Sequence, residues 1–588
     1  MNLPVFLNKV DAFASKMSHE DLAGFVHEIA RTLPEEKRSY FLDTLKNFSG
    51  QKTQRKIAED DGYNTLAEDI EAIKGKLGEI NDGKRCLESE YNEEWDDWYN
   101  PDADEVIFKD YENVLDDIDE AIELIHRCID MELYKEGCEL AELLSVLEVS
   151  ADGDYNDMDG SPLSIHELDR YRLLDCDFKE TVKECLYLTY MGNQISDRAD
   201  EIFCMMENFE CYDLSLENIL QAGDSELPEF DAFLTEWIAY LGQQGSHHAG
   251  QLLREAQVML PDENVQIANA RKYAVVHPSL YKQFLEMKLD SGENEKLLQI
   301  GVEALGQIPE SYVIRSQAAL LTAEYACKLQ DKDRAEACWL EAFRSDSTVL
   351  NYLRIRFRTR DWTKYKDAVK TIYEQVYKET EEKSKHMDNR YLADRQAENS
   401  LHKNEYCLML FLEGQFEKVL ETGMNEKGVL GWSMTFMKQG LALFLLLLYE
   451  GEEQTAGIKT MINMASCACK FDRDMYFKGT GESDDTDSGE IFWGLLRQWK
   501  SSVQIADNQR EAWLAKIDEW IEARVEGIMS GNHRNYYGEC ASYIAALGEV
   551  QESLGIPYAK AHIMERYRSE YSRRRAFHQE LRNYGMRK

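Results

Sequence analysis

The chain has 588 residues, more than one ordinary hydrophobic core organises, so several domains or one long array of repeats are expected. Hydrophobic residues make up 44% of it, and only 9 prolines and 34 glycines occur, which argues against a loop-rich or low-complexity protein. The formal net charge of −43 repels phosphate backbones, so it disfavours broad nucleic-acid binding and favours a basic partner.

Cysteine usage and hydropathy indicate the compartment. The 13 cysteines are scattered without framework spacing and lie mostly within apolar helical patterns, as is typical of reduced thiols in a cytosolic protein. Residues 1–10 are too polar and too poor in basic residues for a signal peptide. The longest apolar run, residues 441–449, is shorter than the roughly 18 residues that span a bilayer. We therefore expect a cytoplasmic protein without a membrane segment.

The first two segments differ in polarity. Residues 1–50 predict an N-terminal helical unit with apolar residues at helical spacing: Leu22, Phe25, Val26, Ile29 and Leu33. Residues 51–105 are acidic, and a sparse apolar set predicts one long helix over residues 57–87: Leu66, Ile70, Ile73, Leu77 and Ile80. Trp95 and Trp98 follow among acids. We interpret this part as a hinge that packs on the fold, and the alternative is an exposed acidic–aromatic contact segment.

Residues 106–275 predict a first array of helical hairpins. The clearest hairpin covers residues 111–149, with these apolar positions on its two helices: Val114, Ile118, Ala121, Ile122 and Ile125, then Leu140, Ala141, Leu144 and Leu147. Several further helices are expected between residues 164 and 260. Most of them are bounded by Asp, Ser, Gly or Pro, which favour helix ends.

The expected loop over residues 152–161 is rich in oxygen donors: Asp152, Asp154, Asn156, Asp157 and Asp159. Hard cations such as Ca²⁺ bind carboxylates on flexible turns. With Gly160 at the sixth position of an EF-hand, however, Tyr155 and His166 would stand where acids are required. A solvated loop is the preferred interpretation.

Residues 276–478 hold two consecutive hairpins, over residues 278–347, around which the chain is organised. In the second hairpin, small residues and one tryptophan fall where two antiparallel helices meet: Ala319, Ala323, Ala326, Ala335, Trp339 and Ala342. The first hairpin offers a similar set: Tyr281, Phe284, Leu285, Leu297, Gly301 and Ala304. The pattern resembles the tetratricopeptide repeat, a helix–turn–helix of about 34 residues. The resemblance implies an all-α fold, an α-solenoid of TPR-like antiparallel helical hairpins.

The repeat is degenerate. Leu285 stands where the tetratricopeptide repeat prefers a small residue, and Ser347 replaces the closing proline. Residues 479–489 then form an acidic segment with glycine and serine, which predicts a flexible loop or a surface lid.

Residues 490–588 predict C-terminal helices with a basic cap that includes Arg573, Arg574 and Arg575. These arginines either dock on the acidic body as a terminal cap, or contact nucleic acid or an acidic partner together with interleaved aromatic residues. The last fifty residues loosely resemble the helical tails of bacterial proteins with a SWIM-type zinc finger. Cys467 and Cys469 lack the second metal-binding pair of that finger, so its role is not implied here.

No motif carries recognisable chemistry. Cys467 and Cys469 without further ligands are interpreted as buried thiols, and the adjacent His247 and His248 are weak evidence for a metal. Phosphate-binding loops, dinucleotide fingerprints and nucleophile elbows are absent from the sequence. We expect no catalytic residue, no cofactor and no bound metal; the remaining alternative, a calcium- or zinc-dependent enzyme, predicts metal after purification.

The sequence favours a non-catalytic scaffold or adaptor that binds a protein or peptide partner through a solenoid groove, and its acidic surface favours a basic partner segment. Residues predicted near that groove are Tyr325, Arg354, Arg356 and Arg358. The alternative is a regulatory subunit of a nucleoprotein or defence-type complex, which would contact nucleic acid through the basic C-terminal helix.

Overall fold

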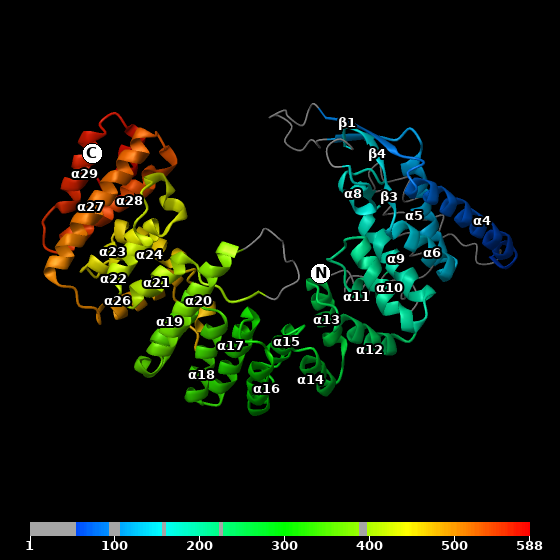
Figure 1. The fold of residues 1–588 in the computed structure, drawn as a ribbon, viewed down its shortest axis with the longest axis horizontal. Helices are drawn as coiled ribbons and strands as arrows, with labels where there is room; N and C mark the ends of the chain where they lie inside the picture. Colours follow the sequence, from blue (N-terminus) through cyan, green and yellow to red (C-terminus); the bar gives the residue numbers. More distant parts are fainter. Residues whose placement is uncertain are drawn as a thin grey trace, which may run out of the picture. The chain divides into compact units, whose positions relative to one another are not determined.

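The computed structural model describes residues 55–92, 106–155, 160–220, 222, 227–386 and 397–587. The chain forms two compact units, unit 1 from Met1 to Phe233 and unit 2 from Leu234 to Lys588 (Figure 1). Helices account for most of the described residues, which confirms the all-α class. The units divide earlier than the boundary expected at residue 275. The predicted N-terminal helical unit, and Trp95 and Trp98, lie outside the described residues.

Unit 1 contains helices α4 (Arg55–Asn81), α5 (Val114–Asp130), α6 (Tyr134–Ser145), α8 (Ile165–Arg170), α9 (Phe178–Gly192), α10 (Ile195–Asn208) and α11 (Leu216–Leu220), and α12 (Phe230–Leu241) crosses its boundary. In α4 the predicted apolar set is buried in full, because one stripe of a polar helix packs on α5 and α6. The predicted extent of this helix is wrong at its end. α4 stops at Asn81, and Leu87 begins a strand.

Unit 1 also contains short strands that helical periodicity did not predict: β1 (Leu87–Tyr91), β2 (Val106–Lys109), β3 (Glu148–Val149), β4 (Ala151–Gly153) and β5 (Leu163–Ser164). β1 pairs antiparallel with β2 and parallel with β4, and β3 pairs antiparallel with β5. The expected loop over residues 152–161 therefore begins as a strand. Its last oxygen donors, Asn156, Asp157 and Asp159, lie outside the described residues.

The first half of unit 2 contains α13 (His247–Met259), α14 (Glu263–Lys272), α15 (Ser279–Met287), α16 (Asn294–Gln307), α17 (Val313–Lys328), α18 (Lys332–Ser345), α19 (Val349–Arg358), η2 (Trp362–Lys364) and α20 (Lys366–His386). The second half contains α21 (Lys403–Leu412), α22 (Phe416–Gly423), η3 (Val429–Met434), α23 (Phe436–Leu448), α24 (Ala456–Ala468), α25 (Arg473–Phe477), α26 (Ser488–Lys500), α27 (Asp507–Ser530), η4 (Arg534–Tyr536), α28 (Tyr537–Ser553), α29 (Ala559–Glu570) and α30 (Arg575–Asn583).

The two predicted hairpins over residues 278–347 are present in the first half of unit 2 as α15–α16 and α17–α18. All the small residues predicted between α17 and α18 are buried, and Ala323 and Ala335 are at most 1% exposed. Gly301 lets α16 approach α17 closely, since a Cβ at this position would overlap the Thr322 side chain. Consecutive helices thus pack through small side chains, as the residue pattern predicted.

The deepest part of unit 2 is built on the most apolar helix. α23 packs against α21, α22, α24, α27 and α28, so residues 441–448 are buried on every side. A helix that is apolar all round belongs inside a larger helical layer, as expected for this run. All 13 cysteines of the chain are free thiols, and those predicted to be buried are buried, except the half-buried Cys327 and the exposed Cys467, for which the prediction is wrong.

Two further expectations for unit 2 are wrong. The final helix, expected over residues 557–584, is interrupted after Glu570 and resumes at Arg575, so it forms α29 and α30. The segment at residues 479–489 is not a free lid at its start, because Gly479 and Thr480 are buried against other helices.

Candidate functional site

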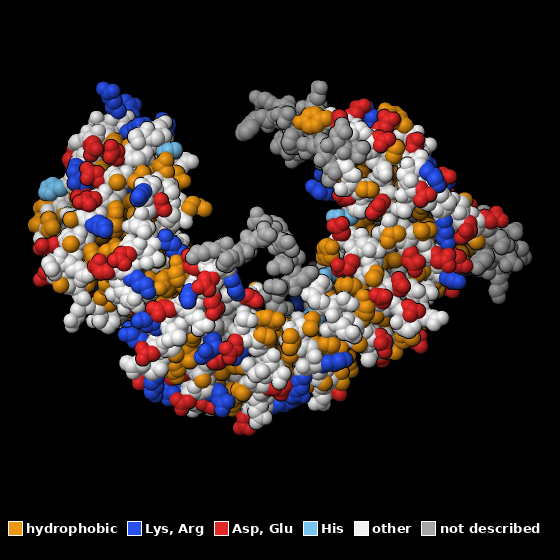
Figure 2. Space-filling view, viewed as in Figure 1, with side chains coloured by type: hydrophobic (Ala, Val, Ile, Leu, Met, Phe, Trp, Pro, Cys, Tyr) orange, Lys and Arg blue, Asp and Glu red, His pale blue; other side chains and the backbone are white. Residues whose placement is uncertain are grey.

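An open groove lies between α5 and α9 in unit 1. It has a volume of about 560 Å³. We call it the acidic groove. The side chains that line it are Asp116, Asp119, Glu120, Ile122, Glu123, His126, Asp175, Cys176, Asp177, Glu180, Thr181 and Glu184. Eight of these are carboxylates. Figure 2 shows acidic side chains at several places on the face of unit 1.

The helices place these acids on one side by their periodicity. On α5 the acids recur three and four residues apart, from Asp116 to Glu123, and therefore share a face. Asp177 caps α9, because its side chain accepts a hydrogen bond from the Glu180 backbone N–H. The acids of α9 then continue along the opposite wall to Glu184.

Within the described residues, ion pairs neutralise only part of this negative charge. His126 Nδ1 lies 2.8 Å from Glu184 Oε1, on the opposite wall. Two lysines outside the groove pair with acids of the lining: Lys76 with Glu120 at 3.0 Å and Lys183 with Glu180 at 2.6 Å. The other five carboxylates have no ion pair there: Asp116, Asp119, Glu123, Asp175 and Asp177.

Burial and crowding of charge alter proton binding in the groove. Burial raises the pKa of Asp119, and the nearby Asp175 and Asp116 raise it further. The hydrogen bond to Glu184 raises the pKa of His126. Both shifts favour the protonated form of the side chain, as expected where negative charges lie close together without enough counter-ions.

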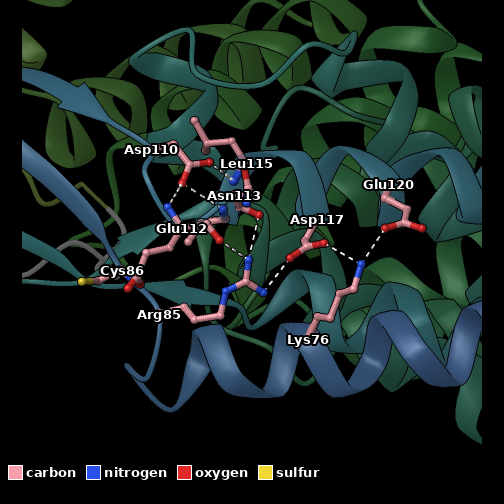
Figure 3. A network of polar contacts seen from close by, with 10 residues as sticks. Lys76, Arg85, Cys86, Asp110, Glu112, Asn113, Leu115, Asp117 and Glu120 are labelled. Carbon is pink, nitrogen blue, oxygen red and sulfur yellow. Dashed lines mark hydrogen bonds and ion pairs between the residues drawn. The ribbon is translucent and has the colours of Figure 1, made fainter.

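A polar network holds the α5 wall on α4 (Figure 3). Asp117, which is 7% exposed, forms two ion pairs: its Oδ1 lies 2.7 Å from Lys76 Nζ and its Oδ2 lies 2.6 Å from Arg85 Nη1. Asp110 accepts hydrogen bonds from the backbone N–H groups of Val114 and Leu115 at the start of α5. These contacts fix the helix and its register, so the groove is built on a rigid wall.

The four residues predicted near a solenoid groove divide into two groups. Tyr325 and Arg354 are 0% and 1% exposed, so the expectation that they line an open surface is wrong. Tyr325 donates a hydrogen bond from its hydroxyl to the Leu285 carbonyl at 2.5 Å. Arg356 is half-buried, with its guanidinium 5.1 Å from the Trp362 ring centroid.

Arg354 and Arg358 meet at a second place. Both contact the stretch that includes α25 and the start of the predicted flexible loop: Arg354 donates to the carbonyls of Met475 and Tyr476, and Arg358 pairs with Glu482. Burial lowers the pKa of the Arg354 guanidinium to about 10. These two arginines therefore bind a segment of their own chain.

The three predicted C-terminal arginines also differ from one another. Arg574 docks on the body, donating to Asn532 Oδ1 at 2.6 Å and to the Met529 carbonyl at 2.8 Å. Arg573 and Arg575 are exposed and have no ion-pair partner among residues 397–587. Figure 2 shows Lys and Arg side chains interspersed with acidic ones over the C-terminal helices.

The residues considered as candidate metal ligands do not come together in the structure. Cys467 is exposed and Cys469 is buried, since two residues along a helix turn the side chains to different sides. Within the described ranges, no group of three or more His, Cys, Asp or Glu side chains is arranged to hold a metal ion. Over the same ranges, no helix has the length and hydropathy needed to cross a bilayer.

Comparison with known proteins gives no relative: no family model, no curated protein and no solved structure matches the chain. The acidic groove was not predicted from the sequence. The periodic acids of residues 116–123 and 175–184 could have indicated two acidic helix faces, but not that α5 and α9 would place them opposite each other.

Proposed function

We propose that this protein is a non-catalytic scaffold, and that the acidic groove of unit 1 binds a basic segment of a partner protein. The observation that carries the proposal is the set of five carboxylates without ion pairs, gathered around one cavity on a fixed helical wall. An extended chain that carries lysine or arginine would supply the missing cations.

The helical organisation supports the same conclusion. Consecutive helical hairpins that pack on their neighbours form a solenoid when the repeat continues, and solenoids bind partners along extended faces. We propose this arrangement for the hairpins from α15 to α24. The strong negative charge of the chain would also accelerate encounter with a basic partner.

The test is binding of a short fluorescein-labelled peptide in which lysine alternates with glycine, followed by fluorescence anisotropy. A variant with Asp116→Asn, Glu123→Gln and Asp175→Asn removes three exposed, unpaired charges from the groove. We expect its affinity for the peptide to fall about tenfold, because each charge contributes a screened but additive attraction.

The control removes the same number of charges elsewhere on unit 1. Glu68→Gln, Glu79→Gln and Glu148→Gln replace exposed acids outside the groove and change the net charge equally. A selective loss in the groove variant supports a site there. Equal losses in both variants would mean that the peptide responds only to the overall charge, and would overturn the proposal.

A further inference from the structure

A short stretch of unit 2, residues 475–482, lies across three helices that are distant from it in sequence. We call it the docked segment. It begins in α25, which packs on α19, and continues past α17 and α18. After it, residues 483–487 are exposed before α26 begins.

The helices hold this segment largely by its main chain. Arg354 donates from Nε to the Tyr476 carbonyl at 3.2 Å and from Nη2 to the Met475 carbonyl. Trp339 Nε1 on α18 donates to the Gly479 carbonyl at 2.8 Å, and Glu324 on α17 accepts from the Gly481 backbone N–H at 3.2 Å. Main-chain contacts of this kind can be made by any segment that adopts the same path.

Two glycines let the segment approach the helices. Gly479 and Gly481 have φ of 75° and 67°, the left-handed region that favours glycine. A Cβ at Gly479 would lie 2.6 Å from the Leu320 carbonyl oxygen, and one at Gly481 would lie 2.8 Å from Cys327 Cβ. The surface therefore recognises a Gly-x-Gly pair by shape as well as by hydrogen bonds.

Side chains at both ends of this pair add charge recognition. On the far side, Glu482 forms an ion pair with Arg358, and the Arg358 guanidinium also lies 5.3 Å from the Phe477 ring centroid. On the near side, Lys478 approaches Glu286 of α15 at 4.0 Å. The pattern that the surface accepts is thus an aromatic residue, a basic residue, Gly-x-Gly and an acidic residue.

We infer that the surface of α17, α18 and α19 is a peptide-binding site that the docked segment occupies as an intrachain ligand. A partner segment with the same pattern, an aromatic and a basic residue before Gly-x-Gly and an acid after it, displaces the docked segment and takes its contacts. Displacement moves the short helix α25 off α19 together with the segment, and the exposed stretch at residues 483–487 supplies the slack on the other side. The site is separate from the acidic groove, so either can fail without the other.

The first experiment releases the docked segment from the surface and then measures binding of a synthetic peptide in its place. In the full chain, Gly479→Ala with Gly481→Ala introduces the two overlaps and releases the segment. The probe is a labelled synthetic peptide with the sequence of residues 471–484. We expect it to bind the double variant at least about tenfold more tightly than the wild-type protein, in which the site is occupied.

The peptide itself provides the matched control. A second peptide with alanine at the positions of Gly479 and Gly481 should bind the variant about tenfold more weakly, since the same overlaps arise in trans. Equal binding of both peptides would overturn the inference. So would a folded variant that binds neither peptide, because the surface would then serve only to hold its own loop.

A second variant guards against simple misfolding of the first. Glu482→Arg breaks the ion pair from the exposed side of the docked segment and leaves Arg358 and its contact with Phe477 in place. It should increase exchange of the docked segment for the labelled peptide, whose own glutamate at this position can pair with Arg358, and Glu482→Arg combined with Arg358→Glu should restore wild-type occupancy. Failure of the charge swap to restore occupancy would contradict the inference.

Discussion

The acidic groove of unit 1 and the docking surface of α17–α19 are both built from helices, but they differ in how many of their charged side chains have a partner. In the groove, five carboxylates have no ion pair within the described part of unit 1. On the docking surface, Arg354, Arg358 and Glu324 are all engaged by residues 475–482. An open charged surface is available to a partner immediately, whereas an occupied one requires exchange, so the two surfaces are expected to differ in stability, salt dependence and pH dependence.

The largest expected effect concerns the buried cation of the occupied surface. Arg354→Met removes the donor to two main-chain carbonyls and leaves both without it, so the free energy of unfolding of unit 2 should fall by about 3 kcal/mol. Urea denaturation followed by tryptophan fluorescence measures the loss. The control, Arg356→Met, removes a half-buried guanidinium stacked on Trp362 and should cost less than about 1 kcal/mol. Similar losses would show that Arg354 has no special role.

The next largest expected difference between the two surfaces is the salt dependence of their affinity for peptides. Affinity of the groove for a lysine–glycine peptide should fall about tenfold between roughly 50 and 300 mM NaCl, because exposed charges are screened over a Debye length. The peptide of residues 471–484 should lose much less affinity for the Gly479→Ala, Gly481→Ala variant, since main-chain hydrogen bonds dominate there. Parallel titrations by fluorescence anisotropy give both slopes. Equal slopes would remove the distinction between the surfaces.

Protonation of His126 should change the affinity of the acidic groove for the lysine–glycine peptide by a smaller factor. The charged groups that face His126 are Glu184 on α9 and Glu123 and Asp130 on α5, and the raised pKa of His126 keeps it protonated above the ordinary value of 6.5. As the pH rises through this raised pKa, the groove loses one positive charge. Peptide affinity should therefore increase a few-fold between about pH 6 and pH 9.

The same titration changes stability in the opposite direction. The His126–Glu184 pair contributes stability that is fully present below the unfolded pKa and is lost as the pH rises through the folded pKa. His126→Gln should abolish the pH dependence of peptide affinity. An unchanged profile in that variant would assign the effect to another group.

The smallest expected effect concerns nucleic acid. The net charge of −43 opposes phosphate, and Arg574 is used in docking on the body, so we expect little binding of a labelled single-stranded RNA at physiological salt. Any binding should disappear in Arg573→Glu with Arg575→Glu, the exposed pair. Strong, salt-sensitive binding lost in this variant would favour the nucleoprotein alternative over the scaffold.

Much of the helical fold followed from local pattern. The small-residue spacing predicted the contact between α17 and α18, and the apolar run at residues 441–448 predicted a buried helix, because side-chain volume and hydropathy decide such contacts residue by residue. The strands around residue 87 were missed. Each is only two to five residues long and gains its partners from distant parts of the chain, which leaves little periodicity to detect.

The two candidate sites show the same division. The helix content, the core-facing stripes and the excess of acid can be predicted from the amino-acid sequence, since these depend on composition and on spacing along one element. That α5 and α9 face each other across a cavity, and that Arg354 meets residues 475 and 476 instead of solvent, is visible only in the folded chain. Those contacts join positions far apart in sequence, and long-range pairing is set by the packing of whole elements, which local periodicity does not encode.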